Sequence, residues 1–191
     1  MKARDSGMPD EKMWGKFFNP KKILESLGID NKTENVAEFG CGYGTFTIPA
    51  AKIIKGKIFA LDIEPEMIAI TKNKADQQKL KNIEAVLRDF IAEGSGLKDK
   101  SLDYVMLFNI LHLEEPVELL IEAHRILKNN GKVGIIHWNY DPATPRGPAM
   151  DIRPKPEQCI QWAEEAGFFK PVLFDLKPYH YGITLLKKGG E

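Results

Sequence analysis

The sequence has few of the residues that disulfide frameworks, metal sites and membrane spans require. Its two cysteines in 191 residues are too few for a set of disulfides and do not have the spacing of a metal-ligand pair. No apolar run approaches the roughly 20 residues that cross a bilayer, and the charged N-terminus lacks the apolar core of a signal peptide. We therefore expect a soluble, cytoplasmic protein with no metal site and no membrane contact.

Neither sign of charge is in excess. Lys and Arg total 27, and so do Asp and Glu, so no global basic field attracts nucleic acid and DNA is not an expected partner. The length is that of one ordinary domain, and 43% hydrophobic residues can build a substantial core. The state of assembly stays open between a monomer and a homodimer.

What the sequence does contain is a regular alternation of apolar strands and helices. Beyond a first strand that starts at Val36, strands are expected at Lys57–Ile63, Ile83–Arg88, Leu102–Asn109 and Lys132–Trp138. Helices are expected between them at Thr45–Ile54, Pro65–Leu80 and Pro116–Lys128, the last stopped by Gly131. Alternating elements with near-continuous apolar strands predict a parallel sheet with helices on both faces.

The C-terminal third departs from this alternation. Asp141–Pro156 carries five of the twelve prolines and has no helical period, which predicts a long loop. A long loop in a compact domain is usually functional. After it, we expect a helix at Pro156–Gly167 and two strands at hairpin spacing, Val172–Lys177 and Gly182–Lys187.

The most informative stretch is an apolar run that leads into a glycine-rich turn. Its glycines stand at every second position: Gly40, Gly42 and Gly44. Glycine tolerates positive φ and lets the backbone approach a ligand, so a strand, this turn and a helix predict a nucleotide-shaped site. A dinucleotide fingerprint would need a glycine where Thr45 stands. Glu38 would repel a pyrophosphate and attract an ammonium or sulfonium, which favours a cationic ligand.

The E-x-G-x-G-x-G pattern resembles the first motif of the class I S-adenosylmethionine-dependent methyltransferases. The resemblance covers about Lys32 to Lys188, since that family also ends in a hairpin whose last strand is antiparallel. It implies an α/β fold with a Rossmann-like, doubly wound, mainly parallel seven-stranded sheet. It also implies S-adenosyl-L-methionine as cofactor, S-adenosyl-L-homocysteine as product, and in-line displacement at the sulfonium methyl.

The resemblance assigns residues to the cofactor. Asp62 ends a strand 22 residues after Gly40, where it can accept both hydrogen bonds of a ribose diol, and Ile63 would pack on adenine. Asp89 would accept from the adenine amino group, with Phe90 on the ring. The other readings are a helix cap for Asp62 and a surface carboxylate for Asp89. The expected cofactor residues are Glu38, Gly40, Gly42, Tyr43, Gly44, Asp62, Ile63, Asp89, Phe90 and Asn109.

The segment Ser101–His112 resembles the fourth motif of the family. Asn109 ends the fourth strand, where its backbone carbonyl would accept from the cofactor ammonium. Ile110, Leu111 and His112 do not match the Pro-Pro-aromatic sequence that follows in methyltransferases of DNA amino groups. A small-molecule acceptor is therefore expected. The alternatives are a protein or RNA substrate, a module that binds the cofactor without transfer, and a dehydrogenase.

Methyl transfer asks little of a protein, because the sulfonium is already a good leaving group. Catalysis is mostly positioning, with a base only where the nucleophile must lose a proton. Candidates for contact or base are His112, His137 at the end of the fifth strand, and His180 in the final turn. Each has a structural histidine as the alternative. His124 lies on a helix's apolar stripe and is expected in the core.

The two ends of the chain are expected to cover the site. Residues 1–31 would form a helical, aromatic lid on a methyltransferase domain of residues 32–191, with loop 140–156 over the substrate side. Trp14, Phe17 and Phe18 either close over the ligands or pad the sheet.

Arg146 and Arg153 lie in the proline-rich loop. They either bind a substrate carboxylate or phosphate, or are solvated at the surface.

Overall fold

The computed structural model describes residues 10–189 and holds one seven-stranded sheet in the order β3-β2-β1-β4-β5-β7-β6. The first five strands run parallel, and β7 lies antiparallel between β5 and β6. The strands are β1 (Val36–Phe39), β2 (Ile58–Asp62), β3 (Ile83–Leu87), β4 (Leu102–Phe108), β5 (Leu127–Trp138), β6 (Phe168–Leu176) and β7 (His180–Lys187). The expected fold class is confirmed.

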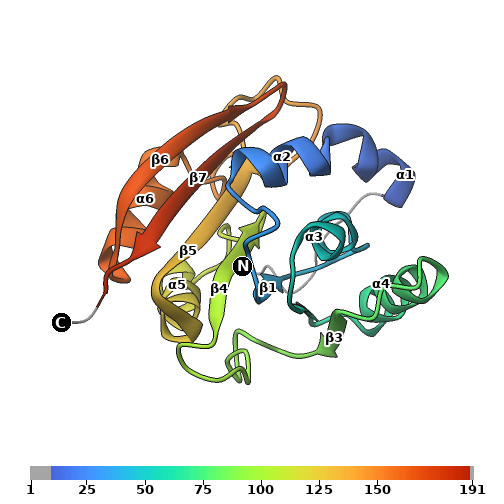
Figure 1. The fold of residues 1–191 in the computed structure, drawn as a ribbon. Helices are drawn as coiled ribbons and strands as arrows, with labels where there is room; N and C mark the ends of the chain where they lie inside the picture. The colour runs from blue at the N-terminus through green and yellow to red at the C-terminus, as the bar shows by residue number, and fades with distance from the viewer. Residues whose placement is uncertain (1–9, 190–191) are drawn as a thin grey trace.

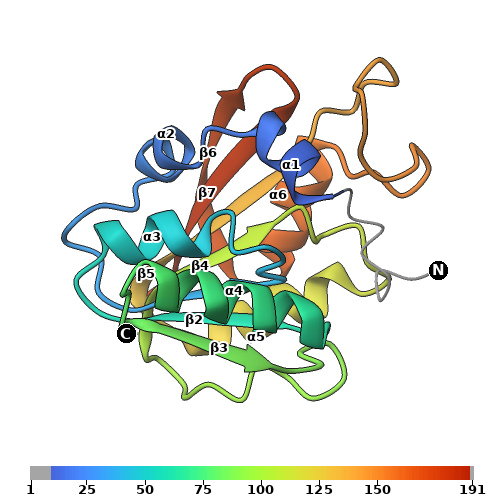
Figure 2. The same ribbon diagram turned by 90° about the vertical axis from the view of Figure 1, so that its right-hand side faces the viewer.

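Helices cover both faces of the sheet, with α2, α3 and α4 on one face and α5 and α6 on the other (Figures 1 and 2). The helices are α1 (Glu11–Trp14), α2 (Pro20–Ser26), α3 (Thr47–Ile53), α4 (Pro65–Gln77), α5 (Pro116–Ile126) and α6 (Pro156–Glu165), with a 3₁₀ turn at Gly15–Phe17. No helix of the described residues is long and apolar enough to cross a membrane.

Each face of the sheet has its own apolar core, because successive strand residues point to opposite sides. Along β4, Val105 and Leu107 pack with α5 and α6, whereas Tyr104 and Met106 pack with α2 and α3. Burial on both faces explains why the central strands read as near-continuous apolar runs. The carboxyl ends of β1, β2, β4 and β5 therefore meet at one edge of a rigid sheet.

Several predicted boundaries are wrong. Helix α5 ends at Ile126 and β5 begins at Leu127, because Leu127 is already extended and pairs with Leu102, so Gly131 lies inside a strand. Strand β6 begins at Phe168, with two residues between it and the end of α6, rather than at the predicted Val172. His180 lies in strand β7, not in the turn, because it pairs with Trp138 of β5.

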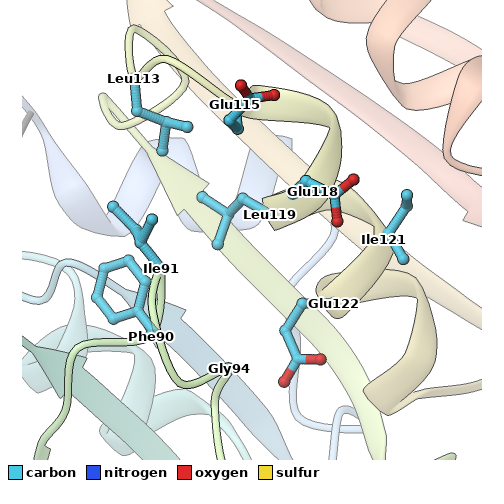
Figure 3. A pocket seen from close by; sticks show the side chains of 9 residues that line it. All are labelled: Phe90, Ile91, Gly94, Leu113, Glu115, Glu118, Leu119, Ile121 and Glu122. Carbon is cyan, nitrogen blue, oxygen red and sulfur yellow. The ribbon is translucent and has the colours of Figure 1, made fainter. Parts of the chain in front are cut away.

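The connection between β3 and β4 contains no helix or strand. A pocket of about 220 Å³ lies between this connection and α5. Figure 3 shows Phe90 and Ile91 on one side of it and Leu119 on the other. Its remaining lining is Gly94, Leu113, Glu115, Glu118, Ile121 and Glu122. Phe90 is the one predicted cofactor residue in this lining. None of residues 40–44 lines the pocket, so it is separate from the glycine turn.

The packing of β5 on β4 leaves no room for a side chain at Gly134. A Cβ there would lie 2.2 Å from the hydroxyl of Tyr104, which is buried and held by donation to the Leu27 carbonyl at 3.0 Å. We predict that Gly134→Ala destabilises the fold by about 1 to 3 kcal/mol, the usual cost of overpacking. Chemical denaturation measures this loss, with Gly15→Ala as control because no atom lies within 4 Å of its added Cβ.

The contact between Gly134 and the Tyr104 hydroxyl also predicts that the stability effects of substitutions at these two positions are coupled. Tyr104→Phe alone should cost about 1 to 3 kcal/mol, because it leaves a buried carbonyl unpaired. The double variant should lose less than the sum of the two single losses, since the clashing hydroxyl is gone. Strict additivity would contradict the proposed clash.

Candidate active site

The glycine turn joins β1 to α3 in left-handed backbone. Gly40, Gly42 and Gly44 have φ of 74°, 50° and 71°, a region that L side chains rarely adopt. A Cβ on Gly44 would also lie 3.0 Å from the Thr71 hydroxyl. Helix α3 begins at Thr47 rather than at the predicted Thr45, because the turn continues for two more residues. These three positions carry no side chain, so a ligand could approach the backbone of the turn closely.

The buried carboxylate of Asp62 holds this turn against the end of β2. One oxygen accepts the Gly42 N–H at 2.8 Å, and the other accepts the Glu64 N–H at 3.0 Å. Burial raises the pKa of Asp62, while these backbone hydrogen bonds oppose the rise. Ile63, next in the chain, is half-buried.

Helix α4 supports the turn from the other side. The Thr71 hydroxyl donates to the Gly42 carbonyl at 3.0 Å, and Lys74 donates to the Tyr43 carbonyl at 2.6 Å. Lys74 also forms an ion pair with Glu11 of α1. The glycine turn, α4 and the N-terminal segment are therefore linked through one lysine.

Glu38 lies beneath the turn with an exposed fraction of 2%. The Thr47 hydroxyl of α3 donates a hydrogen bond to its carboxyl group. Burial raises the pKa of Glu38 to about 8, and the negative charge of Asp62 adds to the rise, so the ligand-free carboxyl binds a proton at neutral pH. A cation close to Glu38 would favour its ionised form.

Asp89 and Phe90, which follow β3, have different surroundings. Asp89 accepts the Ala92 N–H at 3.0 Å and so helps to close the loop. The ring of Phe90 is 6% exposed and packs edge-on against Phe39, with ring centroids 5.2 Å apart. Phe90 therefore stabilises the core on the α5 face and also lines the pocket beside α5.

Asn109, directly after β4, has a strained and unsatisfied geometry. Its φ is 56°, and its backbone N–H donates to the Ile136 carbonyl at 2.7 Å. Both polar atoms of its side chain, Oδ1 and Nδ2, are buried and have no hydrogen-bond partner among the described residues. Such an amide is costly unless a ligand satisfies it.

Two of the candidate histidines are in contact. His112 Nδ1 lies 3.3 Å from His137 Nε2, and the Trp138 N–H donates to His137 Nδ1 at 3.0 Å. Burial lowers the pKa of His112 to about 4. Burial, with the nearby His112, His180 and Arg153, lowers the pKa of His137 well below its ordinary value. Both rings are therefore neutral near pH 7.

The other two histidines have separate environments. His180 is buried between the rings of Phe18 and Trp138, at centroid distances of 4.4 and 4.2 Å, and neither ring nitrogen has a hydrogen-bond partner within residues 10–189. Burial lowers the pKa of His180 to about 3. The prediction that His124 belongs to the core is only partly right. Its ring packs against Phe168 but is half-buried instead of buried.

Aromatic residues of the N-terminal segment lie over the carboxyl ends of the strands. Phe17 packs on Trp138 and Tyr179, and Phe18 packs on Phe46 just after the glycine turn. Trp14 packs on both of these phenylalanines. The segment thus bridges the glycine turn and the His180 side of the sheet.

Arg153 has a role that sequence reasoning missed. It is 7% exposed and is neither solvated nor open to a ligand, because its guanidinium binds the loop around it. It donates to oxygens of Asn139, Asp141, Thr144, Arg146 and Pro148. No sequence motif identifies such a residue, because all of its partners except the Thr144 hydroxyl are backbone carbonyls, which any sequence offers.

Comparison with known proteins agrees with this geometry. Residues 30–167 match the methyltransferase domain family. This chain belongs to that family. An uncharacterised methyltransferase-like protein of Schizosaccharomyces pombe is 32% identical over 117 residues, 61% of this chain and 42% of that protein. Demethylmenaquinone methyltransferase of Chlorobaculum parvum is 30% identical over 145 residues, 66% of this chain and 56% of that protein.

The methyltransferase fold is also shared with solved structures. A SAM-dependent methyltransferase from Aquifex aeolicus superposes with a TM-score of 0.82 at 24% identity, over 93% of each chain. At that identity the likeness shows the fold. The present chain spans about half the length of the curated relatives that it matches.

The expected cofactor, S-adenosylmethionine, is that of the family, and the residues of this methyltransferase domain fit it. The turn offers backbone in left-handed conformation, the carboxylate of Asp62 ends the neighbouring strand, and the buried amide of Asn109 lacks a partner. Among the described residues, the side-chain N and O atoms of Asn109 and both ring nitrogens of His180 are buried without a hydrogen-bond partner at this edge of the sheet.

The raised pKa of Glu38 predicts a pH-dependent stability. Between about 4.5 and about 8 the unfolded chain loses this proton while the folded protein keeps it, so the free energy of unfolding falls as pH rises. Glu38→Gln should remove this fall and gain stability over the wild type as pH increases through that interval. Denaturant unfolding at a series of pH values measures it.

The matched control is Glu66→Gln, an exposed glutamate in the first turn of α4. Its stability should run parallel to that of the wild type across the same interval. A Glu38→Gln curve parallel to the wild type would show that Glu38 is already ionised in the folded protein.

Proposed function

We propose that this protein transfers the methyl group of S-adenosylmethionine to a small-molecule acceptor by in-line displacement. The observation that carries the proposal is the glycine turn closed onto the buried carboxylate of Asp62. When bound, the cofactor supplies a methyl group on a sulfonium that is already a good leaving group. The protein's own contribution is to hold both reactants in line.

Asp62 would bind the ribose. Its two oxygens accept the N–H groups of Gly42 and Glu64, and a carboxylate has about four acceptor sites, so two sites are left for the ribose hydroxyls. Ile63 and the backbone at Asp89 and Phe90 would line the adenine. The position of Asp62 at the end of β2 supports this role, since ligands of such sheets bind at the carboxyl ends of strands.

Glu38, Tyr43 and Asn109 would serve the methionine end. The buried carboxyl of Glu38 favours a cationic group, and the unpartnered side chain of Asn109 offers a donor and an acceptor. Tyr43 is half-buried in the turn itself. Together these groups would orient the sulfonium toward the acceptor.

The acceptor side supports a planar, largely apolar substrate. Phe17, Phe18, Trp138 and Tyr179 form an aromatic cover next to the histidines, and aromatic rings favour flat partners. Of the predicted lid, residues 1–31, the described part from Asp10 onward would cover the site, while residues 1–9 lie outside the described residues. Loop 140–156, organised by Arg153, would act as the substrate-side cover. The likeness to a demethylmenaquinone methyltransferase supports an acceptor of this class.

The binding step is tested by calorimetry of the purified protein with S-adenosylhomocysteine and, separately, with NAD. We expect binding of S-adenosylhomocysteine and no binding of NAD.

The transfer step is tested with methyl-labelled S-adenosylmethionine and, as candidate acceptors, reduced 1,4-naphthoquinone, a phenol, an amine and an RNA pool. Label in a small aromatic acceptor is the expected result. Binding without label in any acceptor would favour a non-catalytic module, and label in RNA would overturn the small-molecule assignment.

Asp62→Asn should weaken binding of S-adenosylhomocysteine by about 1.5 to 3 kcal/mol, because hydrogen bonds to a charged group are lost. Asp76→Asn, on the exposed side of α4, is the matched control and should bind as the wild type does. An unchanged dissociation constant in Asp62→Asn would exclude its ribose role.

Binding of the cationic ligand should also release a proton. The ammonium of S-adenosylhomocysteine would lower the pKa of Glu38 from about 8, so the neutral carboxyl gives up its proton near neutral pH. Calorimetry in buffers of different ionisation enthalpy measures the released protons. Glu38→Gln should abolish the release, and release that persists in this variant would assign the proton to another group.

A further inference from the structure

A chain of hydrogen bonds determines which nitrogen of two histidines carries a proton. The backbone N–H of Trp138 donates to Nδ1 of His137 at 3.0 Å. An N–H group cannot donate to a protonated nitrogen, so the neutral ring of His137 carries its proton on Nε2. That Nε2 lies 3.3 Å from Nδ1 of His112, which must therefore accept. Neutral His112 then carries its own proton on Nε2.

The surroundings of His137 keep both rings neutral. The titratable and charged groups that face His137 are His112 from the β4–α5 connection, His180 and Tyr181 from β7, and Arg153 from the long loop. None of these groups is a carboxylate, and the guanidinium of Arg153 opposes a second positive charge. The tautomers set by the backbone are therefore the forms present near neutral pH.

The outer nitrogen of His112 is available to a ligand. His112 is half-buried, whereas His137 is completely buried behind it. In residues 10–189, Nε2 of His112 makes no hydrogen bond, so its N–H is a free donor at the carboxyl edge of the sheet, three residues past Asn109. Its orientation is fixed by His137, which β5 holds rigidly.

We infer that His112 donates a hydrogen bond to an oxygen of the methyl acceptor, and that His137 is the positioning residue that fixes this donor. A general base at His112 would need Nε2 without a proton. The proton of His112 would then lie on Nδ1 and be donated to Nε2 of His137. His137 would then carry its own proton on Nδ1, where it would meet the N–H of Trp138. The backbone of β5 thus excludes the tautomer that a base requires.

This inference rests on the proposed function and narrows its acceptor. The acceptor carries a lone-pair oxygen, such as a carbonyl, phenolate or enolate oxygen, beside or at its nucleophilic atom. In the transfer the nucleophile's electron pair forms the bond to the methyl carbon, and the pair of the breaking C–S bond passes to sulfur. An acceptor that arrives as an oxyanion has no proton to lose, so His112 keeps its proton throughout.

The tautomers are measured without any substrate. Long-range ¹H–¹⁵N correlation spectra of the ¹⁵N-histidine-labelled protein distinguish Nδ1–H, Nε2–H and charged rings. We expect His112 and His137 both as Nε2–H tautomers at neutral pH, with signals assigned from His112→Gln and His137→Gln. An Nδ1–H or charged His112 would overturn the inference.

Variants test the positioning role. His137→Gln keeps an amide N–H that can donate to His112 and should preserve the Nε2–H form, whereas His137→Leu should leave His112 as a mixture of tautomers. His124→Gln, on the far side of α5, is the control and should leave both signals in place. A unique Nε2–H form of His112 in His137→Leu would show that His137 does not set it.

The pH profile separates the donor from a base once an acceptor is labelled. If His112 is a hydrogen-bond donor, kcat/KM for a phenolate-forming acceptor follows the pKa of the acceptor, and His112→Gln retains part of the activity. If His112 is a general base, His112→Gln abolishes activity at every pH, which would overturn the inference. If no acceptor is labelled while the spectra show Nε2–H forms, the proposed function fails and the tautomer assignment stands.

Discussion

One buried carboxylate joins the parts of the molecule on which the site depends. Asp62, at the end of β2, accepts N–H groups from the glycine turn after β1 and from the residue before α4, so a single side chain joins two strand ends and one helix start. The turn is in left-handed backbone, and Asp62 pairs the N–H of the buried Gly42, which would be costly to leave without a partner. Burial is the main reason why the pKa of Glu38 is raised, and the nearby negative charge of Asp62 adds to the rise, so a cation would favour the ionised form of Glu38.

The two sides of the proposed site differ in the chemical groups that they present. The proposed cofactor side consists of carboxyl groups and backbone, which suit a polar and positively charged ligand. The proposed acceptor side consists of neutral histidines and aromatic rings, with Arg153 bound to the carbonyls of its own loop. Burial keeps the histidines uncharged, so this side acts through shape and through single hydrogen bonds instead of through charge.

Prediction succeeded where a residue's role depends on its neighbours along the chain. The strand ending at Asp62 and the glycine conformations follow from local pattern and were predicted correctly. The end of α5 was wrong, because Leu127 leaves the helix to pair with Leu102, a partner far away in the chain. The same reason applies to His180, which its pairing with Trp138 places in β7.

The sequence by itself determined the fold class, the family and the polar residues at the ends of the first two strands, since apolar periodicity, glycine and acid at short spacing are local properties. Only the tertiary structure decided that Phe90 packs in the core, that Arg153 organises a loop and that His112 meets His137. Those two histidines are 25 positions apart and are joined because neighbouring parallel strands end at the same edge of the sheet. Their proton positions depend on a backbone N–H of β5, which no side-chain pattern reveals.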